Sequence, residues 1–135
     1  MSEETLGDVD LVIVAGNARS LIANRGDLIA EMARRGIKVG ALVPRADYLP
    51  EVRDLGIPIQ QINLARTGMN PIRDFRSMLE IKRALRAANP DRVFSYTIKP
   101  IVYGTLAARL AGVKRRYAMV TGLGFAYTTS STRTK

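Results

Sequence analysis

Residues Pro90 to Thr128 constrain the fold more than any other part of the chain. This stretch, PDRVFSYTIKPIVYGTLAARLAGVKRRYAMVTGLGFAYT, reads as a strand, a turn, a helix rich in small residues, a second strand and a glycine-containing loop. Two such strands joined by a helix lie parallel in one sheet. Parallel sheets carry helices on both faces and bind ligands just beyond the carboxyl ends of their strands. Functional residues are therefore expected after Tyr96 and near Thr121.

The remaining residues supply three more strands and three more helices. Short apolar, β-branched runs predict strands over 10–15, 37–43, 57–64, 92–96 and 117–121. Apolar residues at helical spacing predict helices over 20–35, near Pro50, 70–88 and 100–110. Because crossovers are right-handed, the simplest arrangement is a three-layer, doubly wound, Rossmann-like parallel sheet of order 3-2-1-4-5. The fold class is α/β.

The helix over 70–88 has the clearest signals. Asn70 is the predicted N-cap and Pro71 the first helical residue. Asn89-Pro90 is predicted to end the helix. The apolar residues predict an inward stripe made of Ile72, Phe75, Met78, Leu79, Ile81 and Leu85.

The length of the chain allows one domain. With 135 residues it can bury a single core. We expect a flexible N-terminus over 1–8, a Rossmann-like domain over 9–127 and a disordered, truncated tail over 128–135. The acidic start MSEETLGDVD is not typical of a signal peptide, and no apolar run approaches about 20 residues. These features predict a cytoplasmic protein.

The composition excludes several kinds of chemistry. Without cysteine or histidine, the chain has no disulfide, thiolate nucleophile, usual zinc site or imidazole base, and no metal site is predicted. The turn AGNARS has one glycine, so a dinucleotide cofactor is not expected, and no phosphate-binding glycine-lysine loop occurs. The net charge is +9, with basic clusters at 34–38, 82–86 and 114–116, which indicates an anionic partner or a solvated surface.

Two predicted turns have polar groups that suit an anion. Gly16-Asn17 follows the first strand, where backbone N–H groups can face an anion, although a turn that only redirects the chain is an equal alternative. After the third strand, Arg66, Asn70 and Arg73 can hold a phosphate on an arginine fork. A plain helix cap beside solvated arginines is the more common arrangement.

The ends of the last two strands have similar candidates. Tyr96, Thr97 and Lys99 combine an aromatic face, a hydroxyl and an ammonium before a helix N-terminus, where sugars or phosphates bind. Helix capping is the alternative role for them. In the TGLGF loop, Gly122 and Gly124 permit backbone conformations that a Cβ forbids, which either aims N–H groups into the same crevice or only shapes a turn.

The ordered motifs resemble the N-terminal half of the family 4 retaining glycosyltransferases. The resemblance rests on PD before a strand, the TIK turn, GTLAARLAGV and a GLG loop, and upstream on NRGDLIAEMARRGIKVGALVP and GIPIQQINLARTGMNPIRDFRSMLEIKRALRAANPD. It covers about residues 8 to 127. RTGMNPIRD and VTGLGF are most similar to bacterial enzymes that extend polyprenyl-diphosphate-linked sugars for surface polysaccharides or glycoproteins.

This resemblance implies a GT-B fold, in which two Rossmann-like domains face each other across a cleft. The chain corresponds to the first, acceptor-side domain, and the expected acceptor is a polyprenyl-diphosphate-linked sugar or another glycan. A nucleotide-sugar donor, expected to be a UDP-sugar, belongs to the missing C-terminal domain, so no cofactor is expected here. No catalytic metal is implied. Transfer by this chain alone is expected to be undetectable, and the enzyme is expected at the anionic inner face of the cytoplasmic membrane.

The family's functional positions can be carried onto this chain residue by residue. Gly16 and Asn17 match a turn facing the donor phosphates, Arg25 matches a basic position on the first helix, and the cleft-lining strand ends match Thr97, Lys99, Thr121 and Gly122. Many relatives have histidine near these strand ends and this chain has none, so no side chain is assigned as a catalytic base. Positioning of the substrates, with stabilisation of an oxocarbenium-like state and of the departing diphosphate, is expected to suffice for retaining transfer.

Two other classes of function fit the same sequence. The net charge of +9 suits a nucleic-acid-binding module, but no recognition motif or basic-aromatic platform accompanies it, so nucleic acid is not the expected partner. A partner-binding Rossmann-like module without catalysis is the third reading, because fold does not determine function.

Overall fold

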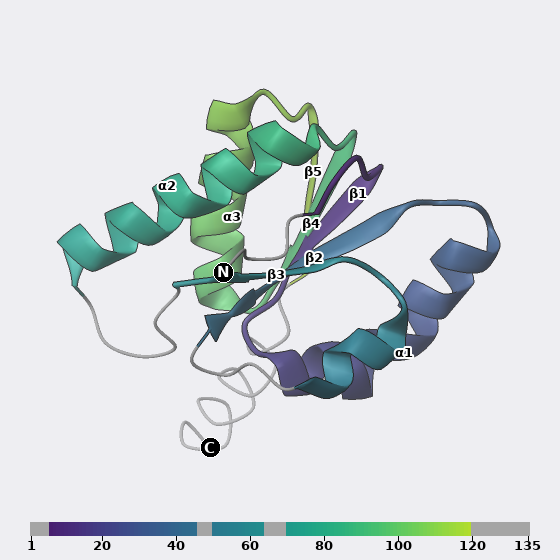
Figure 1. Ribbon diagram of the computed structural model, residues 1–135. Helices are drawn as coiled ribbons and strands as arrows, with labels where there is room; N and C mark the ends of the chain where they lie inside the picture. Colours follow the sequence, from purple (N-terminus) through teal and green to yellow (C-terminus); the bar gives the residue numbers. More distant parts are fainter. Residues whose placement is uncertain (1–5, 46–49, 64–69, 120–135) are drawn as a thin grey trace, which may run out of the picture.

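The computed structural model describes residues 6–45, 50–63 and 70–119, which form a five-stranded parallel sheet (Figure 1). The strand order is β3-β2-β1-β4-β5, as predicted. The elements along the chain are β1 (Leu11–Val14), α1 (Ala18–Arg34), β2 (Val39–Pro44), the 3-10 helix η2 (Pro50–Leu55), β3 (Ile59–Ile62), α2 (Pro71–Ala88), β4 (Arg92–Tyr96), α3 (Ile98–Ala111) and β5 (Arg115–Met119).

Helices cover the sheet on both faces, because its central strands are apolar on both sides. All four residues of β1 are buried, as are all six of β2. One core cluster joins Val12 and Val14 to α2 and α3, and the other joins Leu11 and Ile13 to α1 and η2. Figure 1 shows α2 and α3 together on one side of the sheet and α1 on the other. The chain thus forms the three-layer, doubly wound arrangement.

The ends of the first two helices follow their predicted signals. Gly36 has φ +83° after α1, and the Ile37 N–H donates to Met32 O at 3.0 Å, as in a glycine C-terminal motif. Asn70 caps α2, with its side-chain oxygen accepting the Arg73 N–H at 3.1 Å. At the other end Asn89 is left-handed, with φ 50° and ψ 53°.

Several element boundaries differ from the prediction by two residues, and the starts of α3 and β5 are two of them. Helix α3 begins at Ile98 rather than Pro100. The Ile101 N–H donates to Thr97 O at 3.0 Å, and Pro100 is tolerated because first-turn N–H groups have no partner within the helix. Strand β5 begins at Arg115 rather than Tyr117, in register with Arg92 of β4. Four of its five residues are exposed, so charged side chains fit there.

The predicted inward stripe of α2 is wrong in its first turns. Ile72 and Phe75 are 70% and 56% exposed, whereas Asp74 and Ser77 are buried. The buried stripe contains Asp74, Ser77, Met78, Ile81, Ala84, Leu85 and Ala88. This stripe keeps helical spacing, but it begins with polar residues that have hydrogen-bond partners on other elements.

Candidate functional site

The topology of the sheet creates a crevice beside β1 and β4. These strands are neighbours, yet α1 after β1 packs on one face and α3 after β4 packs on the other. Ligands of doubly wound sheets bind at such a switch point, outside the carboxyl ends of the strands. Four predicted residues, Gly16, Asn17, Tyr96 and Thr97, lie at these two strand ends.

Gly16 and Thr97 are in direct contact across the switch point. A Cβ placed on Gly16 would lie 2.6 Å from Thr97 Oγ1 and 3.6 Å from Pro100 Cγ. Glycine is therefore required for the close approach of the two strand ends rather than for an unusual turn. We call these adjoining strand ends, Gly16-Asn17 and Tyr96-Thr97, the rim.

Thr97 has a strained backbone at the rim. Its φ and ψ are 67° and 159°, a combination that is nearly exclusive to glycine. Its side chain makes no capping hydrogen bond to α3, although it occupies the N-cap position. The capping alternative for the Thr97 hydroxyl is therefore not realised. Backbone strain of this kind gathers at functional sites.

Arg25 packs on the ring of Tyr96 at the rim. The Arg25 guanidinium carbon lies 4.7 Å from the centroid of the Tyr96 ring, in cation–π geometry. Tyr96 is 1% exposed and Arg25 is half-buried. The predicted aromatic face of Tyr96 is thus covered by protein, and it supports the guanidinium of Arg25 instead of offering a stacking surface to a ligand.

Lys99 belongs to the first turn of α3 and is held by α2. Its Nζ lies 3.3 Å from Asp74 Oδ1, and the Tyr103 hydroxyl donates to Asp74 Oδ2 at 3.1 Å. The hydrogen bond to this carboxylate raises the pKa of Tyr103 above its ordinary value of 10.0, and desolvation and the carboxylate charge add to the shift. Lys99 and Tyr103 of α3 thus both bind Asp74 of α2, and these contacts join the two helices near their amino ends. Asp74 itself is buried.

The other predicted site residues fall into two groups. Asn70 uses its side-chain oxygen to cap α2, next to the exposed Arg73. Arg66, Thr121, Gly122 and Gly124 lie outside the described residues, as do residues 1–5 of the N-terminus expected to be flexible over 1–8 and the whole tail 128–135.

Sequence reasoning missed Asp74 and Tyr103. Asp74 lies between Arg73 and Arg76 in the first turn of α2. An acidic residue at this position is usually a surface residue that interacts favourably with the helix dipole. The available signal was its spacing, because Asp74, Met78, Ile81 and Leu85 follow one another at helical intervals.

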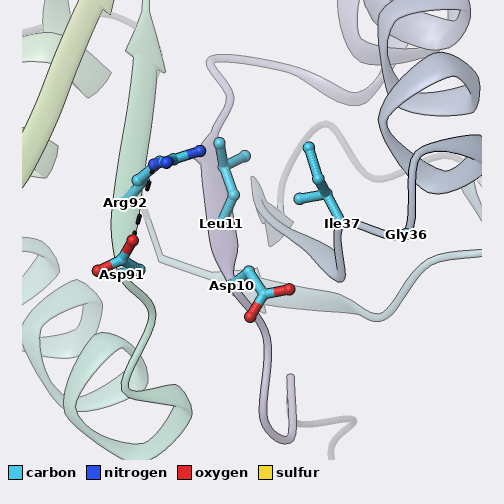
Figure 2. A pocket seen from close by; sticks show the side chains of 6 residues that line it. All are labelled: Asp10, Leu11, Gly36, Ile37, Asp91 and Arg92. Atoms are coloured by element: carbon cyan, nitrogen blue, oxygen red, sulfur yellow. Dashed lines mark ion pairs between the residues drawn. The ribbon is translucent and has the colours of Figure 1, made fainter.

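A pocket also lies at the other end of the strands, where β1, β2 and β4 begin (Figure 2). It is lined by Asp10, Leu11, Gly36, Ile37, Asp91 and Arg92, which begin or precede β1, β2 and β4. Asp10 Oδ2 accepts the Lys38 N–H at 3.0 Å, and Asp91 forms an ion pair with Arg92 at 3.7 Å. Asp10 thus links the start of β1 to that of β2, and Asp91 links the start of β4 to that of β5 through an ion pair with Arg115 at 3.6 Å.

The described residues contain neither a metal-binding cluster nor a membrane-spanning helix. No group of three or more acidic side chains within 6–45, 50–63 and 70–119 is arranged to hold a metal ion. Within the same residues, each helix is too short or too polar to traverse a lipid bilayer.

The fold and its rim define a Rossmann-like domain of the kind found in GT-B proteins. A family model described as "Glycosyl transferase 4-like" matches residues 12–134, and the chain therefore belongs to this family.

One relative agrees with this assignment in sequence, and two solved structures agree with the fold. The chain is 30% identical over 103 residues to N,N'-diacetylbacillosaminyl-diphospho-undecaprenol alpha-1,3-N-acetylgalactosaminyltransferase of Campylobacter jejuni, an alignment covering 76% of this chain and 27% of the relative. In fold it is similar to Acinetobacter baumannii MurG, with a TM-score of 0.64, 18% identity and coverage of 82% of this chain and 34% of MurG. A conserved Thermus thermophilus protein gives a TM-score of 0.67 at 19% identity, covering 84% of this chain and 66% of that one. The chain thus spans about a quarter of the curated relative's length.

Proposed function

We propose that this chain is the acceptor-side domain of a retaining, nucleotide-sugar-dependent glycosyltransferase in polysaccharide or glycoconjugate biosynthesis. Its acceptor is a polyprenyl-diphosphate-linked sugar. The rim binds the acceptor's diphosphate, and this includes the Gly16-Asn17 turn, for which the family resemblance implied the donor phosphates instead. The donor, a UDP-sugar, is held by a second Rossmann-like domain that faces the rim. The protein works in the cytoplasm, at the inner face of the cytoplasmic membrane.

The observation that carries this proposal is the contact of Gly16 with Thr97 at the switch point. Because Gly16 has no side chain, the ends of β1 and β4 meet closely, and the amino ends of α1 and α3 both begin at the rim. Helix amino ends favour anions through their free N–H groups and their dipoles. Two such ends beside the half-buried Arg25 suit a diphosphate better than a neutral ligand.

Family membership and the named relative support the chemical class. The Campylobacter jejuni relative is named as a transferase acting on a diphospho-undecaprenol-linked sugar. That relative is far longer than this chain, since the alignment covers 27% of it. We therefore place the donor site outside these 135 residues and expect no detectable transfer by this chain alone.

The role proposed for this domain is positioning rather than acid–base chemistry. With no histidine in the sequence, the groups at the rim are backbone N–H groups, the Thr97 hydroxyl and nearby cations. Such groups hold the acceptor diphosphate and orient its sugar toward the donor, which lowers the barrier through proximity.

The test is a calorimetric titration of the chain with farnesyl diphosphate, with uridine diphosphate and with inorganic pyrophosphate. We expect farnesyl diphosphate to bind and Gly16→Ala to weaken its binding by about tenfold or more, which corresponds to about 1.4 kcal/mol. The matched control is Gly26→Ala, whose Cβ would meet only Leu55 Cδ2, at 3.8 Å. Equal binding by wild type and a folded Gly16→Ala variant would show that the rim does not hold the diphosphate. Preference for uridine diphosphate would assign the rim to the donor instead.

A further inference from the structure

Asp74 is the only charged side chain that is buried among the described residues, with 4% of its surface exposed. It lies in the first turn of α2, just after the Asn70 cap. Both of its side-chain partners come from α3: Lys99 Nζ donates to Oδ1 at 3.3 Å, and the Tyr103 hydroxyl donates to Oδ2 at 3.1 Å. The carboxylate thus has one ionic partner and one neutral partner, each on its own oxygen.

The lysine of this cluster belongs to the helix turn that touches the rim. Lys99 follows Thr97 by two residues in the first turn of α3. Its neighbour Pro100 would lie 3.6 Å from a Cβ placed on Gly16, so this turn packs directly against the end of β1. The Lys99 side chain is 21% exposed, whereas that of Asp74 is 6% exposed. A ligand at the rim can therefore reach the ammonium but not the carboxylate.

Stability alone is a weak reason for this ion pair. Lys99 stands at the amino end of α3, where the helix dipole disfavours a cation. Buried ion pairs add little net stability, because the cost of desolvating the charges offsets their attraction. The two helices are already joined by apolar packing, since Met78 of α2 shares a core cluster with Ala107 and Ala108 of α3. A ligand that needs the ammonium gives the pair a better reason.

We propose that Asp74 is a positioning residue for the acceptor's diphosphate: it holds the Lys99 ammonium beside the rim, and Lys99 binds a phosphate oxygen. An ammonium has three N–H donors, and Asp74 accepts one of them, which leaves donors for the ligand. The Tyr103 hydroxyl binds the second carboxylate oxygen and so keeps Asp74 turned toward α3. A lysine that is ordered in advance loses less entropy when it binds a phosphate. This inference rests on the proposed function, because it adds a cation to the same diphosphate site.

The first test is the farnesyl diphosphate titration with Asp74→Asn. This change removes a negative charge near the rim, so charge alone would tighten the binding of an anion. Positioning predicts the opposite: binding should weaken about two- to tenfold, because Lys99 must then be ordered by the ligand. Lys99→Gln should weaken binding about tenfold or more through loss of a charged hydrogen bond. Asparagine has the size of aspartate, and circular dichroism checks the fold.

The double variant shows whether Asp74 acts through Lys99. In a Lys99→Gln background, Asp74→Asn should cause no further loss of diphosphate binding. The matched control is Glu80→Gln, which removes the same charge from the same helix. Glu80 accepts the Asn63 N–H and pairs with Arg45, so this variant should not weaken binding. Unchanged or tighter binding by Asp74→Asn, or an equal loss in both backgrounds, would overturn the proposal.

Lysine acylation provides a second readout that needs no variant to fold. After acetylation with an N-hydroxysuccinimide ester and mass spectrometry, Lys99 of the wild type should react more slowly than the exposed Lys114, which precedes β5. Saturating farnesyl diphosphate should slow the reaction of Lys99 further and leave that of Lys114 unchanged. In Asp74→Asn without ligand, Lys99 should react faster. Absence of ligand protection at Lys99 would overturn its role as a phosphate ligand.

The two readouts separate this inference from the proposed function. Diphosphate binding that is the same in wild type, Asp74→Asn and Lys99→Gln would reject the inference and leave the proposed acceptor site standing. Absence of diphosphate binding by the wild type would reject the proposed function, and with it the ligand role of Lys99. An unchanged acylation rate of Lys99 in a folded Asp74→Asn variant would reject positioning by Asp74 even where the diphosphate binds.

Discussion

Replacement of Gly16 by alanine should destabilise the protein through a single contact. The new Cβ would lie 2.6 Å from Thr97 Oγ1, closer than carbon and oxygen atoms approach without a bond between them. The next nearest side chain, Pro100, would be 3.6 Å away, which is an ordinary contact. The φ of Gly16 is not positive, so alanine fits the backbone and the Thr97 hydroxyl is the obstacle.

The size of the effect follows from the rigidity of the rim. Overpacking of a well-packed position costs about 1–3 kcal/mol. Thr97 cannot relax cheaply, because its own backbone, at φ 67° and ψ 159°, already holds about 1–3 kcal/mol of strain. Replacement of Thr97 by glycine relieves this strain, at an entropic cost of about 0.5–1 kcal/mol. We therefore expect Thr97→Gly to be neutral or stabilising by up to about 2 kcal/mol.

A double-mutant cycle measured by urea unfolding checks this reasoning. With glycine at position 97 the clash disappears, so Gly16→Ala should cost nothing or stabilise by about 0.4–1 kcal/mol. The coupling energy between the two positions should be about 1–3 kcal/mol. Thr97→Val is isosteric, keeps a heavy atom in place of Oγ1 and should give no rescue, which makes it the control. Equal destabilisation by Gly16→Ala in the wild-type and Thr97→Gly backgrounds would refute the contact as the cause.

Three further perturbations test other parts of the structure. Gly104→Ala should cost about 1–3 kcal/mol in urea unfolding, because its Cβ would lie 2.7 Å from Ser95 Oγ, and Ser95→Ala should recover most of this loss. Asn70→Ala removes the α2 cap and should cost about 0.5–2 kcal/mol by thermal unfolding. Tyr103→Phe should destabilise by a constant amount below about pH 10. The raised pKa of Tyr103 means that the hydroxyl's contribution is lost only as pH rises through that value, so a difference that persists at higher pH would contradict the bond to Asp74.

The sheet was predictable because its central strands are short apolar runs, which fit few structures other than buried strands. The residues of β1 are apolar and all buried, and a strand with two apolar faces belongs at the centre of a parallel sheet. The right-handed crossover rule then left little freedom for the strand order. Boundaries were less predictable, since they depend on hydrogen bonds such as Ile101 N–H to Thr97 O that local composition does not reveal.

The inward face of α2 was not predictable from its own residues. Hydrophobicity alone ranks Ile72 and Phe75 above Asp74 and Ser77 as core residues. The polar pair is buried because its partners come from elsewhere in the chain: Asp74 binds Tyr103 of α3, and the Ser77 hydroxyl donates to Asn63 O. Satisfied hydrogen bonds remove the penalty for burying these polar side chains.

The conformation of Thr97 follows from the shortness of the connection between β4 and α3. The strand ends at Tyr96 and the helix begins at Ile98, so the chain must reverse direction at one residue. Threonine is β-branched and gives no sign of a positive φ in a sequence. The same short connection places the amino end of α3 directly on the rim, beside the turn after β1. Under the proposed function, a chain without histidine or cysteine binds an anion with backbone N–H groups, and the packing around the rim maintains the strained conformation of Thr97.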